Sequence, residues 1–257
     1  MAFTPTVQKL PAAPYREGDI FFCSYPKMGR TWVKQFLAQY MSLLFDLGYT
    51  KKFELESLMS IVPSEWLLAS EPDLFVYKGD LRVPRVRFVH YQFGPMFVNM
   101  PVILLTRGIE DTLVSLYYPG AREETISECV RGRLGAVIVW LNGWWKGLPQ
   151  TERFLHITYE NMRENSAREF RAVVDFIGFE YNPEHFREAL RRASFEQMKK
   201  DQGNATGARV RVRKGVVGGY RTDLSEEDVK FIQNTMLRHL HPEVWDALIP
   251  SGKRSRA

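Results

Sequence analysis

Short apolar runs alternate along the chain with longer segments of helical character. Three apolar runs have the length and composition of buried strands, at Ile20–Ser24, Met100–Thr106 and Phe154–Tyr159. Each run precedes a segment that predicts a helix, at about Thr31–Leu47, Asp111–Tyr118 and Ser166–Ile177. This β-α order favours an α/β fold with a central parallel β-sheet flanked by helices. With no repeat or linker in view, we expect a single domain, residues 1–257.

The composition is that of a folded protein and narrows the possible classes. Hydrophobic residues make up 45% and charged residues 25% of the 257 positions. No apolar segment approaches the length of a membrane span, and Met1–Pro14 lacks the pattern of a secretory signal. The two cysteines, Cys23 and Cys129, suggest no disulfide framework, and no Cys/His cluster has zinc spacing. We therefore expect a cytoplasmic protein without membrane insertion and without a metal.

The clearest chemical signal directly follows the first predicted strand. Residues 24–32 read SYPKMGRTW and lead into a predicted helix. A helix N-terminus presents unpaired N–H groups and partial positive charge, and Lys27 adds a full charge beside Gly29. The segment is P-loop-like but is no standard P-loop, because Lys27 precedes the glycine. It predicts a phosphate-like ligand, with an ordinary strand–turn–helix junction as the alternative.

A second signal follows the second predicted strand. Arg107 comes directly after that strand, and Ser115 lies on the next predicted helix. A planar guanidinium and a hydroxyl suit a phosphate monoester. The carboxyl ends of parallel strands form the ligand edge of such sheets, so Arg107 should lie on the same edge as Lys27. The alternative is an ion pair of Arg107 with Glu110 or Asp111 at the helix start.

A late loop and one histidine complete the candidate chemistry. Residues 213–220 read RKGVVGGY, in which two cations and three glycines allow close approach to an anion. A generic basic loop is the alternative. His90 ends a short β-like run and could act as a general base. His156 lies inside a strand pattern and is expected to be structural.

The formal net charge of +5 is compatible with two kinds of partner. One is nucleic acid, but the chain lacks a basic helix or an aromatic RNA-stacking motif, so no nucleic-acid partner is expected. The other is a polyanionic small molecule. Two alternative functions stay open on this basis: a P-loop-like nucleotide kinase, and a basic nucleic-acid-binding protein.

Three segments, taken in order, match one family. Residues 25–32 read YPKMGRTW where the family reads YPKSGTTW, and residues 213–218 match its RKGxxG motif. Its middle motif, an Arg after a strand and a Ser before two tyrosines, matches Arg107, Ser115, Tyr117 and Tyr118. The chain thereby resembles the PAPS-dependent sulfotransferases, in particular the soluble branch acting on small molecules. The matches run from about residue 18 to residue 221.

The resemblance implies a reaction and its residues. PAPS (3′-phosphoadenosine 5′-phosphosulfate) would be the co-substrate and PAP the product, and the sulfuryl group would pass to a hydroxyl or amine of a small, partly apolar acceptor. The implied catalytic residues are Lys27, His90 and Ser115. The implied nucleotide-binding residues are Lys27, Gly29, Arg30, Thr31, Trp32, Arg107, Ser115, Tyr159, Ser194, Phe195, Arg213, Lys214 and Gly215.

Some positions depart from the family pattern or lie outside it. Phe88 stands where the family often has a Lys two places before its histidine, and Met28 and Arg30 replace a Ser and a Thr. The acceptor pocket is expected from aromatic segments near Tyr91, Phe93, Phe97 and residues 120–125. With His90 as base, kcat/KM should rise through a pKa near about 6.5 unless the pocket shifts it.

Overall fold

The centre of the molecule is a four-stranded sheet with the order β2-β1-β3-β4, and all three strand pairs are parallel. The computed structural model describes residues 18–48, 58, 60–64, 83–118, 124–203 and 214–248. The strands are β1 (Ile20–Ser24), β2 (Val86–Val89), β3 (Pro101–Thr106) and β4 (Arg153–Thr158). The predicted parallel sheet is confirmed.

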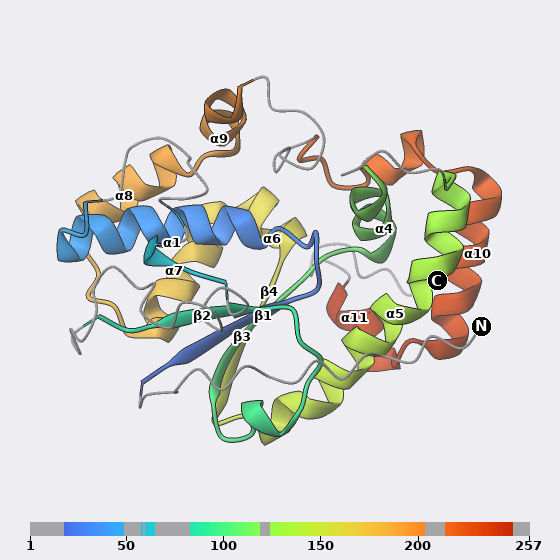
Figure 1. Cartoon of the computed structure of the whole chain (residues 1–257), viewed down its shortest axis with the longest axis horizontal. Helices are drawn as coiled ribbons and strands as arrows, with labels where there is room; N and C mark the ends of the chain where they lie inside the picture. The colour runs from blue at the N-terminus through green and yellow to red at the C-terminus, as the bar shows by residue number, and fades with distance from the viewer. Residues whose placement is uncertain are drawn as a thin grey trace.

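Helices lie in two groups beside this sheet (Figure 1). One group consists of α1 (Arg30–Phe45), α6 (Tyr159–Glu164), α7 (Ser166–Ile177), α8 (Pro183–Arg192) and α9 (Phe195–Gln202). The other group consists of α4 (Ile109–Tyr117), α5 (Ile126–Gly147), α10 (Glu226–His239) and α11 (Pro242–Leu248). Short 3₁₀ turns are η1 (Pro95–Phe97), η2 (Leu148–Gln150) and η4 (Gly219–Thr222). No helix in the described ranges is long and apolar enough to cross a membrane.

The central strands are buried along their whole length, which explains their uninterrupted apolar sequence. Every residue of β1 and β3 is buried, as is typical of parallel strands covered on both faces. Cys23 in β1 is fully buried, so it packs as a small apolar residue, as predicted. β4 lies at the edge of the sheet and exposes its first two residues, Arg153 and Phe154.

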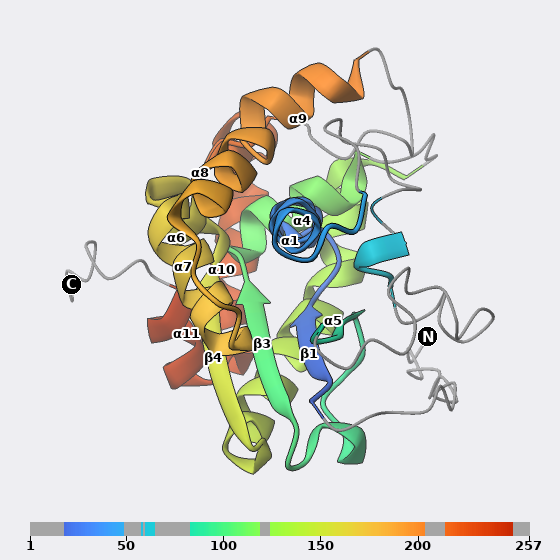
Figure 2. The same ribbon diagram turned by 90° about the vertical axis from the view of Figure 1, so that its left-hand side faces the viewer.

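The strand order creates the ligand edge. From β1 the chain crosses to β2 on one side, and it later returns to place β3 on the other side of β1. The carboxyl ends of β1 and β3 therefore meet where the order reverses, the usual ligand position in open α/β sheets. Pairing of Ser24 with Leu105 sets these ends side by side. In Figure 2 the arrow of β3 points toward the helices that follow the two strands.

Element boundaries differ from the predictions by a few residues, for local reasons. α1 ends at Phe45 because Asp46 adopts a left-handed φ of 52° and its N–H bonds the carbonyl of Ser42. Tyr159, predicted as the end of a strand, begins α6, because the Thr158 hydroxyl caps that helix by accepting from Asn161 N–H. α7 has the predicted bounds.

His156 is structural, as predicted. Its Nε2 lies 2.9 Å from the Thr106 hydroxyl, and its ring meets the Trp145 ring edge-on with centroids 5.3 Å apart. Burial lowers the pKa of His156 from 6.5 to about 4. The neutral ring therefore joins β3, β4 and α5.

A buried ion-pair cluster fixes the opposite edge of the sheet. Asp19 is fully buried, and its oxygens accept from Arg85 at 2.6 and 2.7 Å and from Arg87 at 3.3 Å. Arg87 is itself 1% exposed. A buried carboxylate is costly unless opposite charges and hydrogen-bond donors lie beside it. Arg85 and Arg87 supply both to Asp19, so the three residues hold the start of β1 to β2.

We expect Asp19→Ala to lower the free energy of unfolding by about 3–5 kcal/mol, because the arginines would keep buried charges without their carboxylate. Chemical denaturation measures the change. Glu226→Ala is the control, since it removes only the exposed Glu226–Lys230 pair and should cost less than about 1 kcal/mol. Equal losses in the two variants would contradict the assigned role of Asp19.

Candidate active site

The loop between β1 and α1 is shaped by two left-handed residues. Lys27 has φ 71° and Gly29 has φ 106°. A Cβ at Gly29 would lie 2.6 Å from Cδ2 of Tyr159, so only glycine fits there. α1 starts without a side-chain cap, a setting in which a helix N-terminus attracts anions. Met28 is fully buried, so it anchors the loop in the core where the family has a Ser.

Arg107 lies beside this loop, as predicted from the strand order. Its Nη1 donates to the Lys27 carbonyl at 3.2 Å, and its guanidinium carbon lies 4.3 Å from the ring centroid of Tyr159. Its Nη2 lies 4.0 Å from the Asp111 carboxylate. The ion pair at the helix start, which the sequence offered as the alternative, is therefore also present, but its distance is long. Its buried Nε has no hydrogen-bond partner among the described residues. Arg107 therefore joins the Lys27 loop and retains donor capacity.

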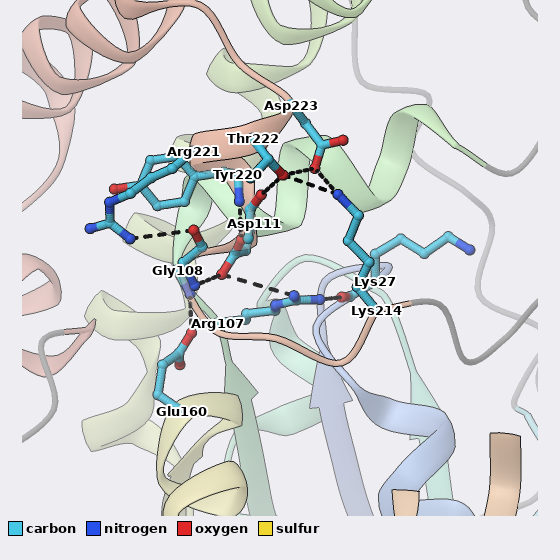
Figure 3. Close-up of polar contacts among 12 residues, drawn as sticks. Lys27, Arg107, Gly108, Asp111, Glu160, Lys214, Tyr220, Arg221, Thr222 and Asp223 are labelled. Carbon is cyan, nitrogen blue, oxygen red and sulfur yellow. Dashed lines mark hydrogen bonds and ion pairs between the residues drawn. The ribbon is translucent and has the colours of Figure 1, made fainter. Parts of the chain in front are cut away.

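Asp111 connects Arg107 to the late loop (Figure 3). Its carboxylate accepts from the backbone N–H of Gly218 at 2.7 Å and of Tyr220 at 2.9 Å. These bonds hold η4 against the first turn of α4. In the sequence, Asp111 is expected only as an ion-pair partner of Arg107, and no local pattern predicts its bonds to the late loop.

The late loop brings Lys214 and Gly215 to the same edge. Lys214 Nζ lies 2.8 Å from Asp223 and 3.1 Å from the Thr222 hydroxyl. Gly215 has φ 64°, and a Cβ there would overlap the Phe195 ring. The loop backbone thus packs directly on an aromatic side chain. Arg213, predicted to act with Lys214, lies outside the described residues.

Aromatic side chains predicted for a nucleotide base gather near these cations. The indole N–H of Trp32 donates to the Ala193 carbonyl at 2.7 Å, and its ring meets that of Tyr159 at 6.1 Å. Ser194 caps α9, its hydroxyl accepting from Gln197 N–H at 3.2 Å, and Phe195 follows as the first residue of that helix. α1, α6 and α9 therefore place Trp32, Tyr159 and Phe195 in one region.

His90 lies just beyond β2 with a fixed tautomer. Its Nδ1 is 2.5 Å from the carbonyl oxygen of Ser24. Because a carbonyl only accepts, Nδ1 carries the hydrogen, and Nε2 keeps its lone pair. Burial lowers the pKa of His90 from 6.5 to about 3, and the charge of Arg30 contributes next. The pocket therefore shifts the pKa away from 6.5, the condition under which the sequence prediction did not apply, and the ring is neutral and able to accept a proton.

Cations surround His90 from several elements. The positive charges of Arg30, Lys34 and Lys27 all lower the pKa of His90. Lys34 is 2% exposed, and its Nζ donates to the Val62 carbonyl at 2.7 Å. Lys34 also lies 4.7 Å over the ring of Phe88, which is fully buried. Sequence reasoning passed over Lys34, because a lysine in a helical segment is usually on a solvated face.

Ser115 is partly buried on α4, one turn beyond Asp111. This position places it on the helix that begins just after Arg107, as the sequence predicted. Thr31 and Arg30 lie in the first turn of α1, next to Lys27. The structure thus brings together the three loops predicted to act on one ligand.

The predicted acceptor pocket needs one correction. Phe97 is fully buried and packs against Phe21 and Trp144, with ring centroids 5.0 and 4.7 Å away, so it belongs to the core. Tyr91 and Phe93 are only partly buried and follow His90 in the chain. Residues 120–123 lie outside the described part. Across the described ranges, no group of three or more His, Cys, Asp or Glu residues could hold a metal ion.

The chain is similar to members of one protein family over most of its length. The family model of the sulfotransferase domain matches residues 17–242. The chain is 24% identical over 253 residues to flavonol 3-sulfotransferase of Flaveria bidentis, covering 83% of this chain and 79% of that protein. It is 25% identical over 201 residues to sulfotransferase 1A1 of Bos taurus, covering 71% and 66% of the two chains.

A solved structure shares the fold. The crystal structure of mouse sulfotransferase SULT7A1 complexed with PAP superposes with a TM-score of 0.63 at 23% identity. The match covers 93% of this chain and 90% of that one. At this identity the likeness shows that the sheet and its flanking helices are arranged alike.

We expect Asp111→Asn to loosen the late loop, because an amide offers one acceptor oxygen where the carboxylate offers two. Amide hydrogen exchange at Gly218 and Tyr220 should become at least about tenfold faster. Asp175→Asn, which alters only the exposed Arg171–Asp175 pair, is the control and should leave both amides unchanged. Unchanged exchange in Asp111→Asn would show that other contacts hold the loop.

Proposed function

Because the chain belongs to the sulfotransferase family, we propose that it transfers a sulfuryl group from PAPS to a hydroxyl or amine of a small, partly apolar acceptor. One observation carries the proposal: Arg107 bonds the Lys27 carbonyl, while Asp111, four residues on, holds the late loop. Three basic segments distant in sequence therefore converge on one edge of the sheet. A dianionic or more highly charged nucleotide is the ligand that such an edge suits.

The donors of the site fit both anionic ends of PAPS. The uncapped start of α1 and Lys27, with Gly29, Arg30, Thr31 and Trp32, would hold the 5′ end. The partnerless Nε of Arg107 supports a second anion site, since a buried guanidinium donor otherwise costs free energy. The 3′-phosphate would be held by Arg107, Ser115, Lys214 and Gly215, together with Arg213. The adenine would lie near Trp32, Tyr159 and Phe195, with Ser194 beside them.

His90 would act as the general base. Its Nε2 would accept the proton of the attacking hydroxyl as the acceptor oxygen bonds the sulfur. The hydrogen bond from Nδ1 to Ser24 holds the ring in the tautomer that this step needs. When bound, PAPS supplies a sulfuryl group on a phosphate leaving group.

Lys27 would stabilise that leaving group. As the bond from sulfur to the 5′-phosphate oxygen breaks, negative charge gathers on this oxygen, next to Lys27 and the first N–H groups of α1. Positioning and fixed charges of this kind supply most of the catalysis in related phosphoryl transfers. Ser115 would contribute through its contact with the nucleotide.

Arg30 would act at the reacting end of the nucleotide. Among the charged groups, Arg30 lowers the pKa of His90 most, ahead of Lys34 and Lys27. A charge that acts on the base would also act on the sulfuryl group and the acceptor. This placement gives a role to the residue that replaces a threonine of the family pattern.

A nucleotide kinase is the competing function, and ligand binding separates the two. We expect PAP to raise the thermal midpoint through its 3′-phosphate, by an amount equivalent to about 2.7 kcal/mol at a hundredfold excess over Kd. ATP and 5′-AMP, which lack the 3′-phosphate, should produce much smaller shifts at the same concentration. A shift with ATP equal to that with PAP would favour a kinase, and magnesium-dependent ATP turnover would establish one.

His90→Ala should lower transfer of label from PAPS by about 100-fold or more and leave PAP affinity nearly intact, because the base acts on the acceptor. The assay requires an acceptor found by screening with labelled PAPS. In the parent protein, kcat/KM should show no rise attributable to His90 between pH 5 and 8, since a base with a pKa of about 3 is already deprotonated there.

The control for this experiment is His239→Asn, which changes an exposed histidine at the end of α10 and should retain the turnover of the parent. Parent-like turnover in His90→Ala would require another base. A rise of kcat/KM near about pH 6.5 that disappears in His90→Ala would contradict the low pKa of the free enzyme.

A further inference from the structure

One arginine that no motif singled out lies among the aromatic side chains of the site. Arg163 belongs to the last turn of α6. Its guanidinium carbon lies 4.8 Å from the ring centroid of Phe195 and 5.7 Å from that of Trp32. Burial raises the pKa of Tyr159, and the charge of Arg107 lowers it. The charge of Arg163 lowers the same pKa further. One cation therefore lies over two of the three aromatic residues assigned to the base and acts electrostatically on the third.

The electrostatic setting of Arg163 differs from that of its neighbours. Arg168 lies 2.9 Å from Glu169, Arg171 lies 2.8 Å from Asp175, and Arg191 lies 2.7 Å from Glu188. Within the described residues, Arg163 makes no such ion pair. Among the described residues, the contacts of its guanidinium are the rings of Phe195 and Trp32, although a guanidinium usually seeks oxygen or nitrogen acceptors.

The surrounding rings are held in place by the backbone of the site. The Trp32 indole is fixed to the Ala193 carbonyl at 2.7 Å, and Phe195 packs against Gly215 of the late loop. A flat group that enters between these elements would meet ring faces from two sides and the guanidinium from α6. Such an arrangement suits a heteroaromatic base, which stacks on the rings and offers ring nitrogens as acceptors.

We propose that Arg163 is a further nucleotide-binding residue, which recognises the purine base through its guanidinium. This inference rests on the proposed function, because the base is that of PAPS. The guanidinium stacks on the base or donates to its ring nitrogens, and it makes no contact with the phosphates. Arg163 thus adds affinity for the base, whereas Lys27, Arg107 and Lys214 add affinity for the charged groups.

The test compares two probes by isothermal titration calorimetry. PAP carries the base, and ribose 3,5-bisphosphate carries the same phosphates without it. Arg163→Met keeps the apolar stem and removes the donors, so PAP binding should weaken about five- to twentyfold while binding of the base-free probe changes less than about twofold. Arg163→Lys should recover only part of the PAP affinity, because an ammonium lacks the planar fork.

The control is Arg168→Met, which removes the same charge from the neighbouring helix α7 and should leave both probes unchanged. PAP binding by Arg163→Met as tight as in the parent, or tighter, would overturn the inference. Equal weakening of both probes would also overturn it, since the effect would then be one of net charge. If Arg163→Met does not fold, as judged by circular dichroism, Arg163→Lys carries the same comparison.

PAP binding by the parent protein and by Arg163→Met separates failure of the Arg163 role from failure of the sulfotransferase proposal. A parent protein that binds no PAP would refute the sulfotransferase proposal, and the role of Arg163 with it. A parent that binds PAP and an Arg163→Met variant that binds it equally well would refute the role of Arg163 alone.

Discussion

The site depends on two hydrogen bonds that the Asp111 carboxylate accepts from the backbone of Gly218 and Tyr220. They join segments more than a hundred residues apart, and they bring a basic loop to a sheet edge that already carries Lys27 and Arg107. Such a concentration of positive charge is costly without counter-charges. Asp111 and Asp223 supply them, Asp223 by holding Lys214 at 2.8 Å. The acidic residues therefore allow several cations to gather at this edge, where we propose the anion site.

The sequence predicts well what is local or follows from parallel topology. The loop around Lys27 is one continuous segment, and Arg107 is brought to it because β1 and β3 are neighbours in a parallel sheet. The contact of Asp111 with Gly218 has no local signal, since it depends on how a distant loop folds back. Phe97 shows another limit: an aromatic residue near a predicted pocket and one in the core look the same in sequence, and here packing against Phe21 and Trp144 decides for the core.

Cationic side chains that are buried or partly buried are a further feature that the sequence does not reveal. Lys34 was unremarked because helical lysines are mostly solvated, yet it is 2% exposed and bonds a carbonyl and the hydroxyl of Ser64. In sequence, Arg163 looks like Arg168 and Arg191 of the next two helices, which pair with carboxylates. Only the rings of Trp32 and Phe195 around its guanidinium set it apart.

The cations around His90 bear on the proposal that it acts as a base when the nucleotide is bound. Burial and three positive charges hold its pKa at about 3 in the protein alone, which keeps the ring neutral but makes it a weak base. A polyanionic nucleotide bound at this edge would offset those charges and favour the protonated imidazole. In the proposed mechanism, the basicity of His90 would therefore rise when the nucleotide is bound and the acceptor gives up its proton. Its tautomer needs no such adjustment, because the Ser24 carbonyl has already fixed the hydrogen on Nδ1.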